Sequence, residues 1–137
     1  MTKSAVCPKT WFCKPMRVGD IYLVENGDIY PPKKKFSICV CVREGYFLLI
    51  NSENRAMYKC TPILKADHSF LSYDSFIGCN RFFRYTAEQL EQAKYRGSLT
   101  RKELRGLRAH LETISSFAEQ DKALILQSID DALTDED

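Results

Sequence analysis

The chain has 137 residues, of which 45% are hydrophobic and 28% charged, and this composition is typical of a single globular domain. Its formal net charge of +2 excludes the strongly basic character by which some proteins attract polyanions over their whole surface. Residues 1–85 hold 13 Lys and Arg against 7 Asp and Glu, a net of +6, whereas residues 86–137 hold 7 against 11, a net of −4. The basic front half is compatible with phosphate contact, and it is equally compatible with an uneven distribution of surface charge that has no functional role.

The front of the chain predicts a lead-in, a strand and a loop. Residues 1–17 read as irregular, because Pro8 and Pro15 disfavour a helix there. Alternating side chains after Gly19 predict a strand over 19–26. Residues 27–32 then predict a loop, since the paired prolines at its end cannot sit in a central strand.

The stretch FSICVCV, residues 36–42, predicts a central strand, because neither of its alternating faces carries a charge. A tight turn over 43–45 leads into a partner strand over 46–53. Two further strands are predicted over 56–64 and 75–85, with a loop between them.

The pattern changes at Thr86, where the first of three helix signatures begins. Capping-box pairs are formed by Thr86 with Gln89, Thr100 with Glu103, and Ser116 with Glu119. They predict helices over 86–96, from 100 to about 114, and from 116 to 133, with Gly97 ending the first. Leu104, Leu107, Leu111 and Ile114 form a stripe at helical spacing, which belongs either to the core or to a dimer interface.

Strands followed by helices predict an α+β fold. Short antiparallel strands at this spacing often curl up, so we expect a small antiparallel β-barrel followed by three C-terminal helices. Residues 18–99 would form the barrel with the first helix. Residues 100–137 would add a helical hairpin to the same domain.

The six cysteines include no C-x-x-C pair, and the chain has only two histidines. Cys39 and Cys41 point to one face of the predicted strand, about 6.6 Å apart, which is unfavourable for a disulfide. The spacing typical of a structural zinc site is also missing. We therefore interpret the cysteines as small core residues and expect neither a metal nor another cofactor, with Cys7 and Cys13 as candidates for reactive thiols.

Familiar enzyme motifs are missing from the sequence, which has no glycine-rich phosphate loop, no H-E-x-x-H and no G-x-S-x-G. His68 is one candidate for proton transfer, oriented by Asp67 or Asp74, and its alternative is an ordinary loop histidine. His110 is expected to be a partly exposed helix residue.

Several segments together resemble the MazF/PemK family of toxin endoribonucleases. The segments are VGDIYLVENG, KKKFSICVCV after a basic loop, YFLLINSE and YDSFIGCNRFFRYTAEQL, and they cover roughly residues 18–95. The resemblance implies an SH3-like barrel, usually a homodimer, that cuts single-stranded RNA without metal. In that chemistry the ribose 2′-OH attacks the adjacent phosphate and leaves a cyclic phosphate end.

Two positions of the family motif differ in this chain. The family's Arg-Pro is Lys35-Phe36 here, and its Thr at the end of the third strand corresponds to Asn51-Ser52. Ser52 keeps a hydroxyl, but Lys35 offers a point charge where Arg would bind two phosphate oxygens. Arg55 is the candidate to supply the missing guanidinium. The resemblance thus implies Lys35, Ser52 and Arg55 as catalytic residues and leaves open whether RNA is cut or only bound.

The resemblance also implies that Lys33 and Lys34 contact phosphate, and neighbouring aromatics suggest Tyr30 and Tyr46 for stacking on bases. Lysine runs are more usually just solvated, and tyrosines also fill barrel surfaces. The alternative function is therefore a catalytically inactive SH3-like barrel that binds protein or nucleic acid.

No apolar run approaches the roughly 20 residues that cross a membrane, and the N-terminus lacks the apolar core of a signal peptide. We expect a cytoplasmic protein without membrane contact. Its candidate partners are single-stranded RNA, an antitoxin that covers the basic groove, and a second copy of the chain.

Overall fold

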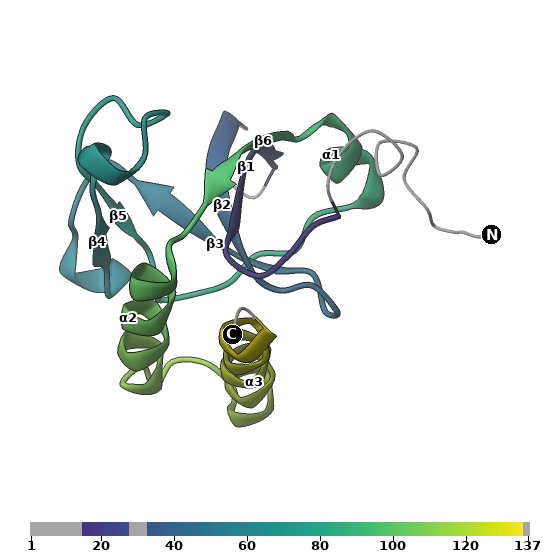
Figure 1. Cartoon of the computed structure of the whole chain (residues 1–137), viewed down its shortest axis with the longest axis vertical. Helices are drawn as coiled ribbons and strands as arrows, with labels where there is room; N and C mark the ends of the chain where they lie inside the picture. The colour runs from purple at the N-terminus through teal and green to yellow at the C-terminus, as the bar shows by residue number, and fades with distance from the viewer. Residues whose placement is uncertain (1–14, 28–32, 136–137) are drawn as a thin grey trace.

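The computed structural model describes residues 15–27 and 33–135, so the predictions for Tyr30, Cys7 and Cys13 lie outside the described residues. The described part is a mixed α+β structure with one curled, antiparallel, six-stranded sheet and three α-helices (Figure 1). The predicted α+β class and the three C-terminal helices are therefore confirmed. None of the helices in this part of the chain is long and apolar enough to cross a membrane.

The sheet has the strand order β4-β5-β3-β2-β1-β6. Its strands are β1 (Asp20–Asn26), β2 (Lys33–Cys41), β3 (Tyr46–Asn51), β4 (Thr61–Ile63), β5 (Ser75–Ile77) and β6 (Lys94–Ser98). Strand β2 lies between β1 and β3, as its uncharged faces predict. It begins three residues earlier than predicted, so the lysine run is part of the strand.

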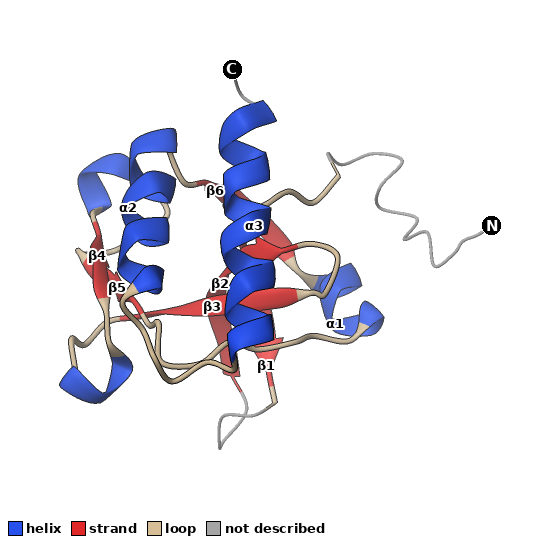
Figure 2. Ribbon diagram, turned by 90° about the horizontal axis from the view of Figure 1, so that it is seen from below, coloured by secondary structure: helices blue, strands red, loops and turns tan. Residues whose placement is uncertain are grey.

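One face of the sheet packs against two helices, α2 (Arg101–Glu112) and α3 (Glu119–Asp135), which lie side by side (Figure 2). Ile21, Ile38 and Leu48 share this helix-covered face, because β1 and β3 pair with β2 in that register. They form one apolar core with buried side chains of both helices. Burial of that shared surface is the main force that holds the layers together.

The opposite face, here called the second face, carries Tyr22, Ser37 and Leu49. The chain after β5 first pairs with the edge of β3, where Phe83 and Phe47 exchange two backbone hydrogen bonds of 2.8 Å each. It then crosses the second face at Tyr85, whose hydroxyl lies 2.8 Å from Ser37 Oγ and accepts from Asn26 Nδ2 at 3.2 Å. β2 is therefore covered by protein on both faces along most of its length.

The leucine stripe of α2 lies inside the core. Leu104, Leu107 and Leu111 are all buried, and Leu107 is only 1% exposed. The alternative that this stripe forms a dimer interface is therefore wrong.

The region around α1 (Ala87–Gln92) differs from the prediction. The capping box of Thr86 and Gln89 is present, but Ala93 adopts an extended conformation and ends the helix early. Residues 94–98 then form β6 along the free edge of β1, with a bulge next to Gly97 (φ +137°). The predicted helix over 86–96 is thus too long, because pairing with an open strand edge outweighs local helix preference.

The fourth and fifth strands are shorter than predicted. Residues 56–58 form a 3₁₀ turn, so β4 keeps only three residues. Beyond β5, Gly78 donates to the Leu49 carbonyl of β3, and an isolated bridge joins Phe83 to Phe47, but no longer strand forms.

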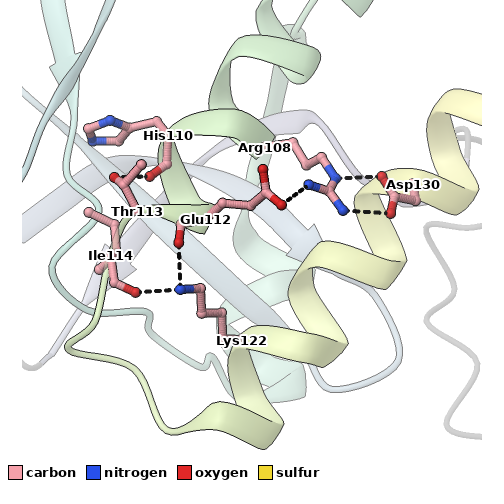
Figure 3. A network of polar contacts seen from close by, with 7 residues as sticks. All are labelled: Arg108, His110, Glu112, Thr113, Ile114, Lys122 and Asp130. Carbon is pink, nitrogen blue, oxygen red and sulfur yellow. Dashed lines mark hydrogen bonds and ion pairs between the residues drawn. The ribbon is translucent and has the colours of Figure 1, made fainter.

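Polar contacts join α2 to α3 on the outside of the helical layer (Figure 3). Arg108 donates to both carboxylate oxygens of Asp130, at 2.6 and 3.0 Å, and also pairs with Glu112 at 2.8 Å. Lys122 Nζ donates to the carbonyls of Glu112 and Ile114, at 2.7 and 2.8 Å. These carbonyls at the end of α2 would otherwise lack partners.

We expect the Arg108–Asp130 pair to make stability depend on acid pH. Arg108 holds the pKa of Asp130 below its usual value. The contribution of this pair to the free energy of unfolding is therefore present above about pH 4 and is lost as the pH falls through the lowered pKa. The Asp130 side chain is 43% exposed and solvent screens the pair. Asp130→Asn should therefore lower the free energy of unfolding at pH 7 by at most about 1 kcal/mol.

Urea unfolding of the wild type and Asp130→Asn at pH 7 and pH 2.5 measures this difference. The matched control is Asp131→Asn, because Asp131 accepts a hydrogen bond from Gln127 instead. A difference for Asp130→Asn that stays the same at both pH values would contradict the assignment.

Candidate functional site

The register of the strands places five residues in a row across the second face. From β1 to β4 these are Val24, Lys35, Asn51, Phe76 and Pro62. Lys35 and Asn51 lie opposite each other because each is two residues from the Ser37–Leu49 pair. Residues i and i+2 of a strand share a face, so Lys33 lies on this face as well.

At the centre of the row, Lys35 Nζ donates a hydrogen bond of 3.1 Å to Asn51 Oδ1. Lys35 is partly buried, and this burial lowers its pKa below the usual lysine value, with a further contribution from the charge of Lys33. Burial acts this way because the ammonium loses hydration that a neutral amine needs less. The structure thus holds a partly desolvated cation at a fixed position.

Gly78 leaves room for the Asn51 side chain. A Cβ added at Gly78 would lie 2.9 Å from Asn51 Nδ2, closer than real Cβ atoms come to a neighbour. The backbone N–H of Gly78 donates to the carbonyl of Leu49 at 2.8 Å, which keeps this segment against β3. A side chain at position 78 would therefore displace the amide end of Asn51 from the place it occupies beside Lys35.

Ser52 follows Asn51 directly and is exposed. Within the part of the chain that is described, its hydroxyl has no hydrogen-bond partner. Lys35 therefore contacts the last residue of β3, which directly precedes Ser52 in the chain.

Arg55 is engaged elsewhere. Its Nε and one Nη donate to Glu53 Oε1 at 2.8 and 2.7 Å, and the guanidinium lies 5.9 Å from the centre of the Tyr58 ring. The structure places Arg55 on a separate cleft, with Lys59 and His110. The guanidinium that the family has beside its phosphate is therefore not supplied by Arg55 in this arrangement.

The remaining predicted RNA-binding residues divide between surface and core. Lys33 and Lys34 are both exposed, but Lys34 lies on the opposite face from Lys35, in register with Glu25. Tyr46 is only 2% exposed, so its ring is not open for stacking on a base. Its hydroxyl donates to Asp121 at 2.9 Å and accepts from Arg84 at 2.8 Å.

Sequence reasoning missed Phe76 and Gly78. Phe76 is partly exposed beside Asn51, but its strand looks apolar in the sequence and gives no sign of which face is open. Gly78 did leave a signal, because a glycine inside a strand-like stretch often marks close approach by another group.

His68 has a different partner from the one proposed. His68 Nε2 lies 2.9 Å from both carboxylate oxygens of Glu103, and His68 is 6% exposed. Asp74 instead accepts a hydrogen bond from the backbone N–H of Lys65. The expectation that Asp67 or Asp74 orients His68 is therefore wrong, and the pair ties the loop after β4 to the start of α2.

The cysteines that are described carry free thiols, of which Cys39, Cys41 and Cys79 are buried, as predicted for core residues. Burial raises the pKa of the Cys39 and Cys79 thiols to about 12, so both stay protonated at neutral pH. Among the described residues, no three His, Cys, Asp or Glu side chains gather in a way that could hold a metal ion.

Comparison with models of known protein families gives no match, and comparison with curated proteins gives none either.

We expect the pKa of Lys35, followed by ¹³Cε chemical shift, to lie below the usual lysine value. Lys33→Gln should raise the pKa of Lys35, because the substitution removes a positive charge that lies on the same face of the strand. The matched control is Lys34→Gln, which removes the next charge along the strand from the opposite face. Equal shifts from both variants would show that the described geometry is not the cause.

Glu103 has two contacts whose contributions can be separated. Its Oε1 accepts from the backbone N–H of Thr100 at 2.8 Å, which completes the capping box of α2, and its carboxylate also faces His68. Glu103→Ala removes both contacts and should lower the free energy of unfolding, measured with urea, by about 1–3 kcal/mol.

Glu103→Gln should cost less than half as much, since an amide oxygen still serves the cap. Equal losses in the two variants would argue against this division.

Proposed function

We propose that this chain is a MazF/PemK-like protein with an SH3-like barrel that binds single-stranded RNA on its second face, at the Lys35–Asn51 contact. The observation that carries the proposal is the 3.1 Å hydrogen bond between these two residues, next to Ser52, whose hydroxyl has no partner among the described residues. The family resemblance adds a cytoplasmic toxin–antitoxin setting, in which an antitoxin covers the site, and a homodimer.

The chemistry of the row suits an unpaired strand. The ammonium groups of Lys33 and Lys35 can donate to phosphate oxygens, which fix a nucleic acid without reading its sequence. Phe76 offers a partly exposed ring beside Asn51, and unpaired bases stack on such rings. Asn51 Nδ2 adds a neutral donor between the cations and the ring.

Cleavage makes further demands on the site. The 2′-oxygen must form a bond to phosphorus while the bond to the 5′-oxygen breaks, so one proton passes from the 2′-OH to solvent water and another reaches the leaving oxygen. Lys35 would offset charge on the phosphorane oxygens and Ser52 would position the phosphate. The lowered pKa of Lys35 also favours its giving up a proton to the leaving oxygen.

One observation favours a second candidate, the catalytically inactive binding module. The guanidinium of Arg55 is paired with Glu53, and Lys35 replaces the family's Arg, so neither residue offers a free forked cation at the Lys35–Asn51 contact. Loss of one such donor costs on the order of 10²–10³ in rate. Such a module would still bind RNA through the same row.

Binding is tested by fluorescence anisotropy with a labelled single-stranded RNA over a range of salt concentrations. Lys35→Ala should weaken binding about tenfold and reduce the salt slope by about one, because one phosphate contact is lost. The matched control is Lys94→Ala, an exposed lysine on the edge strand β6. Absence of RNA binding, or equal weakening by both variants, would refute the proposal.

Cleavage is tested on the same protein with a panel of single-stranded RNAs in chelator. Products with cyclic phosphate ends that Lys35→Ala abolishes and Lys35→Arg retains would identify an endoribonuclease. Binding without products over a broad panel would select the inactive module.

A further inference from the structure

A cleft of about 350 Å³ lies between the segment that joins β3 to β4 and the C-terminal end of α2. Its lining includes Arg55 and Lys59 from the first segment and His110, Thr113 and Ser115 from the second. We propose that this cleft binds a small phosphate-bearing anion, at a site separate from the Lys35–Asn51 contact.

The charge of the lining supports this assignment. Among the described residues, the lining of the cleft includes no Asp or Glu. The ammonium of Lys59 forms no hydrogen bond or ion pair among the described residues, and Arg55 uses only Nε and one Nη on Glu53, which leaves its other Nη for a ligand. The hydroxyl of Ser115 is a further donor without a partner within that part of the chain.

The backbone at Lys59 is held in an uncommon conformation. Its φ is +53°, in the left-handed region, which costs a non-glycine residue roughly 1–2 kcal/mol. His110 Nε2 donates to the Lys59 carbonyl at 2.7 Å, so helix α2 holds this turn in place. Such strain is typical of functional sites that surrounding structure holds in place, and here it fixes the backbone position from which the Lys59 side chain extends.

One effect opposes an anion at this position, because the C-terminal end of a helix carries partial negative charge. Lys122 counters it by donating to the carbonyls of Glu112 and Ile114, and the hydroxyl of Thr113 donates to the carbonyl of His110 (Figure 3). The carbonyls of His110, Glu112 and Ile114 are thus already satisfied.

The volume limits the ligand. Small-molecule pockets span about 300–1,000 Å³, so this cleft is at the lower end of that range. It suits a phosphate monoester of about nucleotide size. The same phosphate chemistry comes from a free ester or from the 5′-phosphate at the end of an RNA, and the experiment separates these sources.

The full-length chain is titrated with sodium phosphate and with adenosine 5′-monophosphate, with sodium chloride at equal ionic strength as reference. We expect saturable binding that shifts backbone amide NMR signals of residues 54–60 and 110–115. Lys59→Asn should weaken it about tenfold, because a charged hydrogen bond is lost. Asparagine tolerates the left-handed conformation, so the variant is expected to fold.

The matched control is Lys102→Gln, an exposed lysine on α2 outside the cleft, which should leave binding unchanged. Lys35→Ala should also leave it unchanged, so the cleft and the RNA surface succeed or fail independently. Phosphate effects no larger than those of chloride, or equal losses in Lys59→Asn and Lys102→Gln, would overturn the proposal.

A short RNA with a 5′-phosphate, compared with the same RNA ending in a 5′-hydroxyl, identifies the source. Tighter binding of the phosphorylated RNA that Lys59→Asn abolishes would support the RNA end as the ligand. Saturable binding of the monophosphate without a preference between the two RNAs would support a free ester.

Discussion

Strand β2 pairs along both of its edges and is covered on both of its faces, and the arrangement of the rest of the molecule follows from this double coverage. Its even-numbered side chains, such as Ile38, meet the helical layer. Its odd-numbered side chains from Lys35 to Cys39 lie on the second face, where Tyr85 of the crossing segment reaches the hydroxyl of Ser37. Beyond the bulge, Cys41 lies with the helical layer and contacts Ser128 of α3. Because alternate residues of a strand must point to opposite faces, neither cover can shift without moving the other. The helices and the crossing segment are therefore mutually constrained through one strand.

The same alternation produces a gradient of burial along the second face. Cys39 and Ser37 are fully buried, Lys35 is partly buried and Lys33 is exposed. Buried polar groups on this face find partners inside the protein, since the hydroxyls of Ser37 and Tyr85 lie 2.8 Å apart. The segment that covers this face ends near Lys35, so the Lys35 side chain lies at the boundary between the core and the solvent. Partial desolvation strengthens its electrostatic effect on any bound anion.

The sequence predicts best those features that depend on local chemistry. The uncharged alternation of β2 and the capping boxes at Thr86 and Thr100 each rest on a few neighbouring residues, and all are present in the structure. Strand β6 escaped prediction because its residues read as the end of a helix, and only the free edge of β1 makes them a strand. The pairing of Lys35 with Asn51 follows from strand register, whereas the pairing of Arg55 with Glu53 and the burial of Tyr46 depend on three-dimensional packing.

The C-terminal helices contribute more than a cover for the sheet. Helix α2 reaches the loop after β4 through Glu103 and His68, and the loop before β4 through His110 and the Lys59 carbonyl. Both ends of this short strand are therefore fixed to one rigid helix. The segment from Asn51 to Lys59 begins at a position set by strand register and ends at one set by α2. Because Lys35 is placed by strand register and Lys59 by helix α2, a change in the helical layer can alter the cleft at Lys59 while the Lys35–Asn51 contact stays in place.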